Sequence, residues 1–179
     1  MDITQRTEEI DQITADFQKS FGHLTAEQLN WNNNGNCWSI AQNIDHIMVI
    51  NKSYEPILAK LNDKGLHLPF MAKLGFMVRL LGKLILSSVE PTRKKKIKTF
   101  SLWEPKATQL DEHILADFVK HQEWLKQTIK ENENKADVTI YSPANKSIVY
   151  KLGTAFEILV AHERRHLNQA LEVLEMKIG

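Results

Sequence analysis

This sequence is poor in the residues that would point to several common protein classes. It contains a single cysteine, Cys37, which excludes an internal disulfide framework and any metal site built from several cysteines. Its 23 lysines and arginines are balanced by 22 aspartates and glutamates, which gives a formal charge of +1. A general nucleic-acid-binding domain would carry a basic excess, so nucleic acid is not an expected partner. Glycine and proline are also scarce, with 7 and 5 in 179 residues, which favours long helices over many short strands.

The sequence also lacks a hydrophobic run long enough to cross a bilayer. The most apolar stretch, Phe70 to Leu86, is interrupted by Lys73, Arg79 and Lys83, and it falls short of the roughly 20 residues that a span requires. The opening residues, MDITQRTEEIDQ, have neither the basic nor the apolar region of a secretory signal. We therefore expect a cytoplasmic protein without a membrane partner, and a single cysteine is compatible with that reducing compartment.

Hydrophobic residues recur at helical spacing in four long segments. Ser39 and Gln42 have the spacing of a capping box at the start of the second, and Thr154 and Glu157 have it at the start of the last. Pro56 falls inside the second helix and should kink it or end it early. The four helices are expected at about Ile3–Phe21, Ser39–Leu61, Pro105–Lys130 and Thr154–Lys177.

Shorter elements are expected between these helices. Thr25 and Gln28 predict a capped turn, and Pro69 could open a further helix from Phe70 to about Leu86. Alternating apolar residues around Ile140 and again from Ile148 to Leu152 predict a small hairpin. The basic run Arg93–Lys98 is better explained as a solvated loop than as a partner surface.

Four amphipathic helices in one chain have to bury their apolar faces against each other. A helical bundle does this with one shared core. We therefore predict an all-α protein, a four-helix bundle with extra short helices and a hairpin-like excursion before the last helix. Residues 1–179 are expected to form one domain.

Two histidines in the last helix have the spacing of a metal-binding pair. His162 and His166 are four residues apart, so their rings lie nearly above each other on one helix face. Leu159, Ala170 and Val173 flank them on the same side. Burying two imidazoles together is unfavourable unless both are neutral and hydrogen-bonded or both bind a cation. The pair therefore predicts either a divalent metal site or, as the plainer alternative, a chance surface pair.

A useful site needs a third ligand, and His46 is the candidate, because it lies at the edge of the apolar face of the second helix. Three histidines with an open fourth position are typical of a catalytic metal site. Zinc is the default ion, while nickel, iron and manganese also accept imidazole. No general base is evident, since Glu163 and Asp45 are only weak candidates, and Gln169 could orient a ligand. We take Cys37 as incidental.

Several segments together resemble the DinB-like superfamily. They are LTAEQLNW at 24–31, WSIAQNIDHI at 38–47 and LGT at 152–154, followed by the helix that carries His162, His166 and Gln169. This family includes DNA-damage-inducible proteins, metal-dependent hydrolases and thiol-dependent transferases of bacteria. The resemblance implies a four-helix bundle with a divalent metal held by three histidines, which by motif position fall on His46, His162 and His166. It also implies that the protein could be a homodimer.

The sequence and this resemblance together predict a metal-dependent enzyme that acts on a small molecule. It would be either a hydrolase or a transferase that uses a low-molecular-weight thiol such as bacillithiol or mycothiol. One alternative is a non-catalytic stress-response module whose metal is structural or absent. A weaker alternative is a membrane-surface role for Phe70–Leu86 with the basic run that follows.

Overall fold

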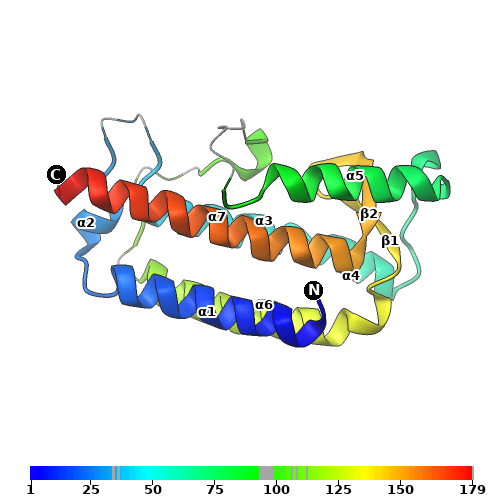
Figure 1. Cartoon of the computed structure of the whole chain (residues 1–179), viewed down its shortest axis with the longest axis horizontal. Helices are drawn as coiled ribbons and strands as arrows, with labels where there is room; N and C mark the ends of the chain where they lie inside the picture. The colour runs from blue at the N-terminus through cyan, green and yellow to red at the C-terminus, as the bar shows by residue number, and fades with distance from the viewer. Residues whose placement is uncertain are drawn as a thin grey trace.

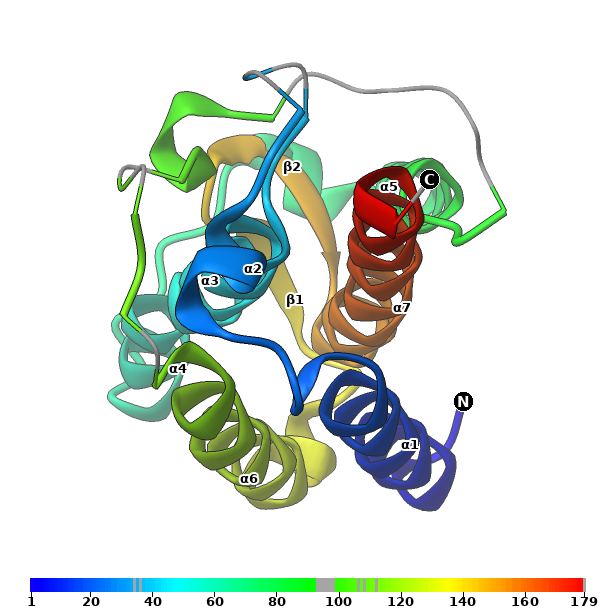
Figure 2. The same ribbon diagram turned by 90° about the vertical axis from the view of Figure 1, so that its left-hand side faces the viewer.

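The protein folds around four long helices that enclose a common core. The computed structural model describes residues 1–33, 35, 37–92, 99–105, 107, 109–111 and 113–178. The bundle helices are α1 (Ile3–Phe21), α3 (Ile40–Lys52), α6 (Ile114–Asn132) and α7 (Leu152–Ile178). Helix α1 packs between α6 and α7, and α3 packs between the same two helices on the opposite side, which closes the bundle (Figures 1 and 2). Helices α1 and α7 run in one direction and α3 and α6 in the other (Figure 1).

The remaining elements lie in the connections between these four helices. Helix α2 (Ala26–Asn30) precedes α3, and α4 (Glu55–Asn62) follows it. The 3₁₀ turns are η1 (Phe70–Lys73), η2 (Ser101–Trp103) and η3 (Glu133–Lys135). Helix α5 (Gly75–Ser88) lies outside the bundle, and strands β1 (Thr139–Ser142) and β2 (Asn145–Lys151) form an antiparallel hairpin before α7. The prediction of a bundle with extra short helices and a hairpin is therefore confirmed.

Local capping signals set the starts of several helices as predicted. The side chains of Thr25 and Ser39 accept hydrogen bonds from the backbone N–H groups of Gln28 and Gln42, and both glutamine side chains accept from the cap N–H in return. Such boxes satisfy N–H groups that have no partner inside the helix. The chain can therefore fix these helix starts with local interactions alone.

The predicted start of the last helix at Thr154 is wrong by two residues. Strand β2 runs directly into α7, which begins at Leu152. The backbone N–H of Leu152 donates to the carbonyl of Val138, and that of Gly153 donates to the carbonyl of Ala136. Because carbonyl groups from the preceding segment already satisfy the first N–H groups of the helix, Thr154 is not needed as a cap.

The predicted helix start at Pro105 is also wrong, since α6 begins at Ile114. Residues 106, 108 and 112 of this stretch lie outside the described residues. The side chain of Asn30 bonds to both backbone groups of Leu110, at 2.9 Å to the carbonyl and 2.8 Å from the N–H. The Gln42 side chain donates to the carbonyl of Ala107. These long-range bonds use backbone groups of Ala107 and Leu110 that a helix would need internally. The described residues between 105 and 113 are accordingly not helical.

The second predicted helix divides near Pro56. Helix α3 ends at Lys52, and Pro56 lies in the first turn of α4, where its missing N–H costs no hydrogen bond. The predicted helix from Phe70 likewise divides into η1 and α5. The basic run Arg93–Lys98 lies outside the described residues.

Helix α5 packs closely against the hairpin and α7. Its Gly82 is buried, and a Cβ atom there would lie 3.2 Å from Thr154 Cγ2 and 3.3 Å from Tyr150 Cβ. The glycine therefore permits the close approach of α5 to β2 and the start of α7. Among the described residues, no helix is both long and apolar enough to cross a bilayer.

Candidate metal centre

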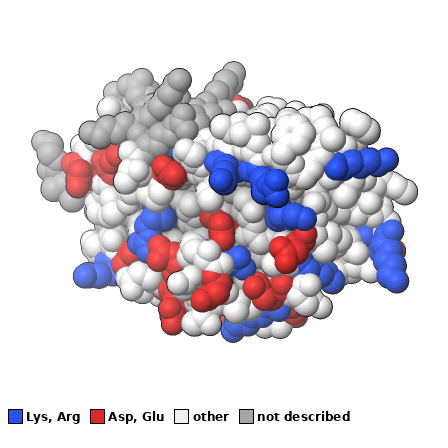
Figure 3. Space-filling view, turned by 45° about the vertical axis from the view of Figure 1, so that its right-hand side comes forward, with Lys and Arg blue, Asp and Glu red and all other residues white. Residues whose placement is uncertain are grey.

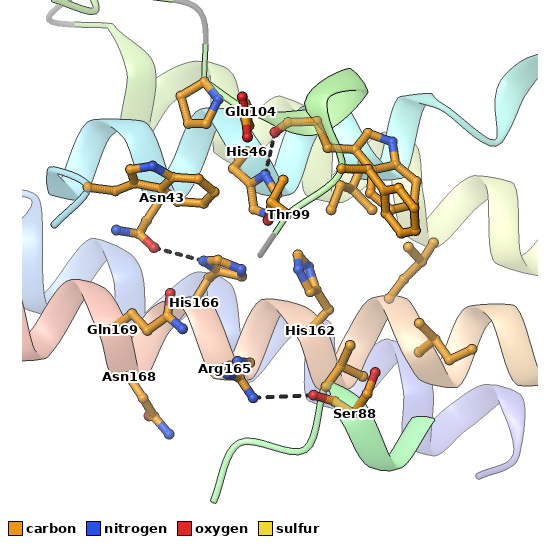
Figure 4. A pocket seen from close by; sticks show the side chains of 18 of the residues that line it. Asn43, His46, Ser88, Thr99, Glu104, His162, Arg165, His166, Asn168 and Gln169 are labelled. Atoms are coloured by element: carbon orange, nitrogen blue, oxygen red, sulfur yellow. Dashed lines mark hydrogen bonds between the residues drawn. The ribbon is translucent and has the colours of Figure 1, made fainter. Parts of the chain in front are cut away.

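Helices α3 and α7 bring three histidines together inside the bundle. His46 comes from α3, and His162 and His166 come from successive turns of α7 (Figure 4). Their ring centroids are 4.4 to 5.1 Å apart, and one nitrogen from each ring lies within 4.8 Å of the others. All three side chains are buried, with exposed fractions of 1%, 8% and 5%. The structure therefore gathers the three histidines that the sequence singled out.

Hydrogen bonds on the far side of two rings fix their tautomers. The carbonyl of Trp103 can only accept, so His46 Nδ1 carries the proton in its 2.6 Å bond to that oxygen. Asn43 donates its Nδ2 to the carbonyl of Ser39, which leaves Asn43 Oδ1 to accept from His166 Nδ1 at 2.7 Å. The Nε2 atoms of His46 and His166 consequently keep free lone pairs. Histidines that bind metals are commonly oriented in this way.

Burial keeps these imidazoles neutral. Desolvation lowers the pKa of His46 to about 4, against a smaller opposing effect of the Trp103 carbonyl. The pKa values of His162 and His166 lie well below 6.5, first through burial and then because a proton on either ring would lie close to Arg165 and to any proton on the neighbouring histidines. A neutral imidazole is the form that coordinates a metal ion.

The donor set fits a divalent ion. Within the described part of the chain, His46 Nε2 and His162 Nδ1 are buried and have no hydrogen-bond partner. Leaving buried polar atoms unpaired costs roughly 1–3 kcal/mol each. A metal ion bound by the three rings would give a partner to each ring nitrogen whose lone pair faces it, and this would remove the cost of leaving that nitrogen unpaired. Three imidazoles suit zinc and also nickel, iron or manganese.

The cluster forms part of the wall of a cavity of about 700 Å³. Helix α7 contributes Arg165 and Gln169 beside the histidines, the 99–105 segment covers another side, and Ile85 and Ile148 add apolar surface (Figure 4). A ligand in this cavity would therefore lie directly beside the three rings. The volume is in the range of small-molecule sites.

Arg165 adds a positive charge to this wall. Its side chain is buried, and its Nη1 donates to the carbonyl of Ser88 at 3.3 Å, near the end of α5. Among the residues that line the cavity, Glu104 and Glu172 are acidic, and both are exposed to water. The charge of Arg165 is close enough to lower the pKa values of His162 and His166.

Sequence reasoning missed Asn43 and the backbone carbonyl of Trp103. Asn43 lies three residues before His46 on α3, so helical spacing could have indicated that it faces the same way. A backbone carbonyl leaves no such signal. Gln169 lies on the cavity wall, but it is Asn43 that bonds to His166. Cys37 is half-buried and also lines the cavity.

Glu163, one of the weak candidates for a general base, points away from the cavity. Its carboxylate is fully buried and accepts from Asn51 Nδ2 at 2.6 Å and from Gln122 Nε2 at 2.8 Å. Burial raises its pKa to about 7 against the effect of these two bonds. Asn51 also contacts the Nε2 of His121 at 3.0 Å. Glu163 thus joins α7 to α3 and α6 behind the histidine cluster.

Comparison with known proteins agrees with the fold. Residues 9–170 match the model of the DinB superfamily. Among solved structures, YfiT from Bacillus subtilis matches with a TM-score of 0.55 and 17% sequence identity, over 99% of this chain and 87% of that one. YfiT is described as a probable metal-dependent hydrolase with an unusual four-helix bundle topology. No curated protein matches the sequence.

Proposed function

This chain belongs to the DinB superfamily, and we propose that it is a metal-dependent enzyme acting on a small molecule. The observation that carries the proposal is the buried cluster of His46, His162 and His166 on the wall of a cavity. Two of the three rings are held by hydrogen bonds that leave a lone pair for coordination. The description of YfiT as a probable metal-dependent hydrolase supports the same conclusion.

The protein's own residues supply the ligands and hold them in place. His46, His162 and His166 would bind the ion as neutral imidazoles, while Asn43 and the Trp103 carbonyl keep two rings in the required tautomer. With three protein ligands, a divalent ion can lower the pKa of a coordinated water toward about 7 or hold a thiol in its thiolate form. Zinc is the ion we expect first.

The charges on the cavity wall favour a substrate with a negative group. Neutral imidazoles do not reduce the charge of a divalent ion, and Arg165 adds a further positive charge that is 8% exposed. Because Glu104 and Glu172 are exposed, water screens their effect. A carboxylate or similar anion could therefore bind beside Arg165, with its apolar part toward Ile85 and Ile148.

Two reactions are compatible with this site. The first is hydrolysis of a small ester or amide. The second is transfer of a low-molecular-weight thiol to an electrophile, as the family resemblance suggests. Among the described residues of the cavity wall, we assign none as a general base.

Metal analysis tests the proposal. Protein purified without chelators should contain close to one divalent ion per chain, and His162→Ala should lose it. His121→Gln is the matched control, because His121 is also buried but lies outside the cluster. Equal metal content in wild type and His162→Ala would contradict the proposed site.

Activity of the metal-loaded protein then separates the two reactions. Release of chloride from a chloronitrobenzene in the presence of cysteine, with formation of a carbon–sulfur bond, would indicate thiol transfer. Cleavage of a nitrophenyl ester without thiol would indicate hydrolysis. A bound metal that raises thermal stability, with neither activity, would favour the non-catalytic stress-response module.

A further inference from the structure

The outer face of α5 exposes a line of large apolar side chains. Phe76, Leu80 and Leu84 follow each other at intervals of four residues and are 59%, 48% and 56% exposed. Residues four apart lie along one side of a helix, so these three form a continuous line, here called the α5 stripe. The opposite side of the helix holds Val78 and Gly82, which are buried against the rest of the protein. The stripe is thus not part of the described core.

Basic side chains accompany the α5 stripe. Arg79 and Lys83 are exposed and lie beside it on the helix, and the exposed Lys73 precedes the helix in η1. From Lys64 to Val89 the sequence contains no aspartate or glutamate. In Figure 3 the side of the molecule where α5 lies is white with blue side chains, while red atoms gather elsewhere on this face. The segment from Lys64 to Val89 is therefore basic, although the whole chain has a formal charge of only +1.

From this combination we propose that the α5 stripe attaches the protein to an anionic bilayer surface. A helix that lies in the interface places apolar side chains among the lipid chains and basic side chains among the headgroups. The long stems of Arg79 and Lys83 can follow the apolar face while their charges reach acidic lipids. With 14 residues, α5 has the length to lie on the surface but not to cross the bilayer.

This proposal revises the expectation that the chain has no membrane partner. The sequence alone could not show which residues of the apolar stretch face outward, and Leu81 and Ile85 on the same helix are largely covered. The proposed membrane attachment does not depend on the metal centre. Attachment through the α5 stripe would, however, place the cavity close to the lipid surface, because Ile85 and Val89 line the cavity at the end of α5.

A second copy of the chain is the competing occupant of this face. A symmetric dimer would bring each α5 stripe against its copy, and the flanking arginine and lysine side chains would then face like charges. Such contacts are unfavourable unless acidic groups intervene, and none occurs between Lys64 and Val89. Charge complementarity therefore favours acidic lipid.

Co-sedimentation of the full chain with vesicles tests the proposal. The protein should pellet with phosphatidylcholine vesicles containing phosphatidylglycerol, not with pure phosphatidylcholine, and less at high salt. Arg79→Gln with Lys83→Gln should weaken partitioning roughly 25-fold, since each basic residue near the surface contributes about fivefold. Leu80→Gln with Leu84→Gln should weaken it by about tenfold or more.

Matched variants separate a local effect from a general one. Lys19→Gln with Lys130→Gln removes the same charge from exposed positions on α1 and α6. Leu102→Gln changes a leucine that is 55% exposed, almost the same as Leu84. Both controls should pellet like the wild type.

Three results would each overturn the proposal. The first is no pelleting with acidic vesicles, and the second is an equal loss in the control variants. The third is a dimer in sedimentation velocity that Leu80→Gln with Leu84→Gln dissociates, since this would assign the stripe to a second copy. Because the changed side chains are exposed, far-UV circular dichroism should show each variant folded.

Discussion

Acid should destabilise the metal-free protein, because four of its histidines are buried in the neutral form. Burial lowers the pKa of His46 and His121 from 6.5 to about 4, and that of His162 and His166 well below 6.5. In the unfolded chain each imidazole regains a pKa near 6.5. Between these values the unfolded state binds protons that the folded state does not. The contribution of these histidines to the free energy of unfolding is therefore complete above pH 6.5 and is lost as the pH falls below 6.5.

The size of this loss follows from the pKa values. Between pH 8 and pH 5, His46 and His121 each remove about 2 kcal/mol from the free energy of unfolding. His162 and His166 act in the same direction, because burial also lowers their pKa values. Glu163 acts in the opposite direction, because its pKa is raised from 4.5 to about 7. Its protonation in the folded state returns about 2.5 kcal/mol over the same interval. His46 and His121 together outweigh Glu163 by roughly 1.5 kcal/mol, and His162 and His166 add to this net loss.

Urea denaturation in the presence of a chelator, followed by circular dichroism between pH 8 and pH 5, measures this loss. His121→Gln should reduce it by about 2 kcal/mol, since one titrating group is removed. Glu163→Gln should increase it by about 2.5 kcal/mol, since the opposing group is removed. A free energy of unfolding that stays constant from pH 8 to pH 5 would refute the reasoning. So would a His121→Gln variant with the same pH dependence as the wild type.

Three further predictions concern the metal centre and the packing of the bundle. Asn43→Ala should weaken zinc binding by about 10- to 100-fold in competition with a chelator, because His166 loses the partner that orients it. Asn30→Ala is the control, because Asn30 is also buried but bonds to the backbone of Leu110. This variant should leave zinc affinity unchanged. Phe118→Ala should lower the free energy of unfolding by about 3–5 kcal/mol in urea, because its ring is fully buried. Arg164→Ala should lower it by roughly 1 kcal/mol, less at high salt, because its partly buried side chain bonds to two carboxylates of α1. Lys120→Ala, at an exposed pair within α6, should have no measurable effect.

The helices and their caps could be predicted because the interactions that form them are local. The boxes at Thr25 and Ser39 join residues three apart, and the apolar residues of α1 recur at helical spacing. The pairing of His162 with His166 has the same origin. Where long-range bonds replace local ones, as at Leu110 and Leu152, the predicted boundaries were wrong.

The sequence by itself determined that this chain forms amphipathic helices, and it showed which histidines could meet on one helix face. Only the tertiary structure decided that His46 reaches the pair on α7, that Asn43 and a carbonyl of Trp103 hold two of the rings, and that the α5 stripe faces outward. The reason is that helix periodicity depends on neighbours in the chain. Convergence of side chains from distant helices depends on how the helices pack, and packing is a property of the whole core.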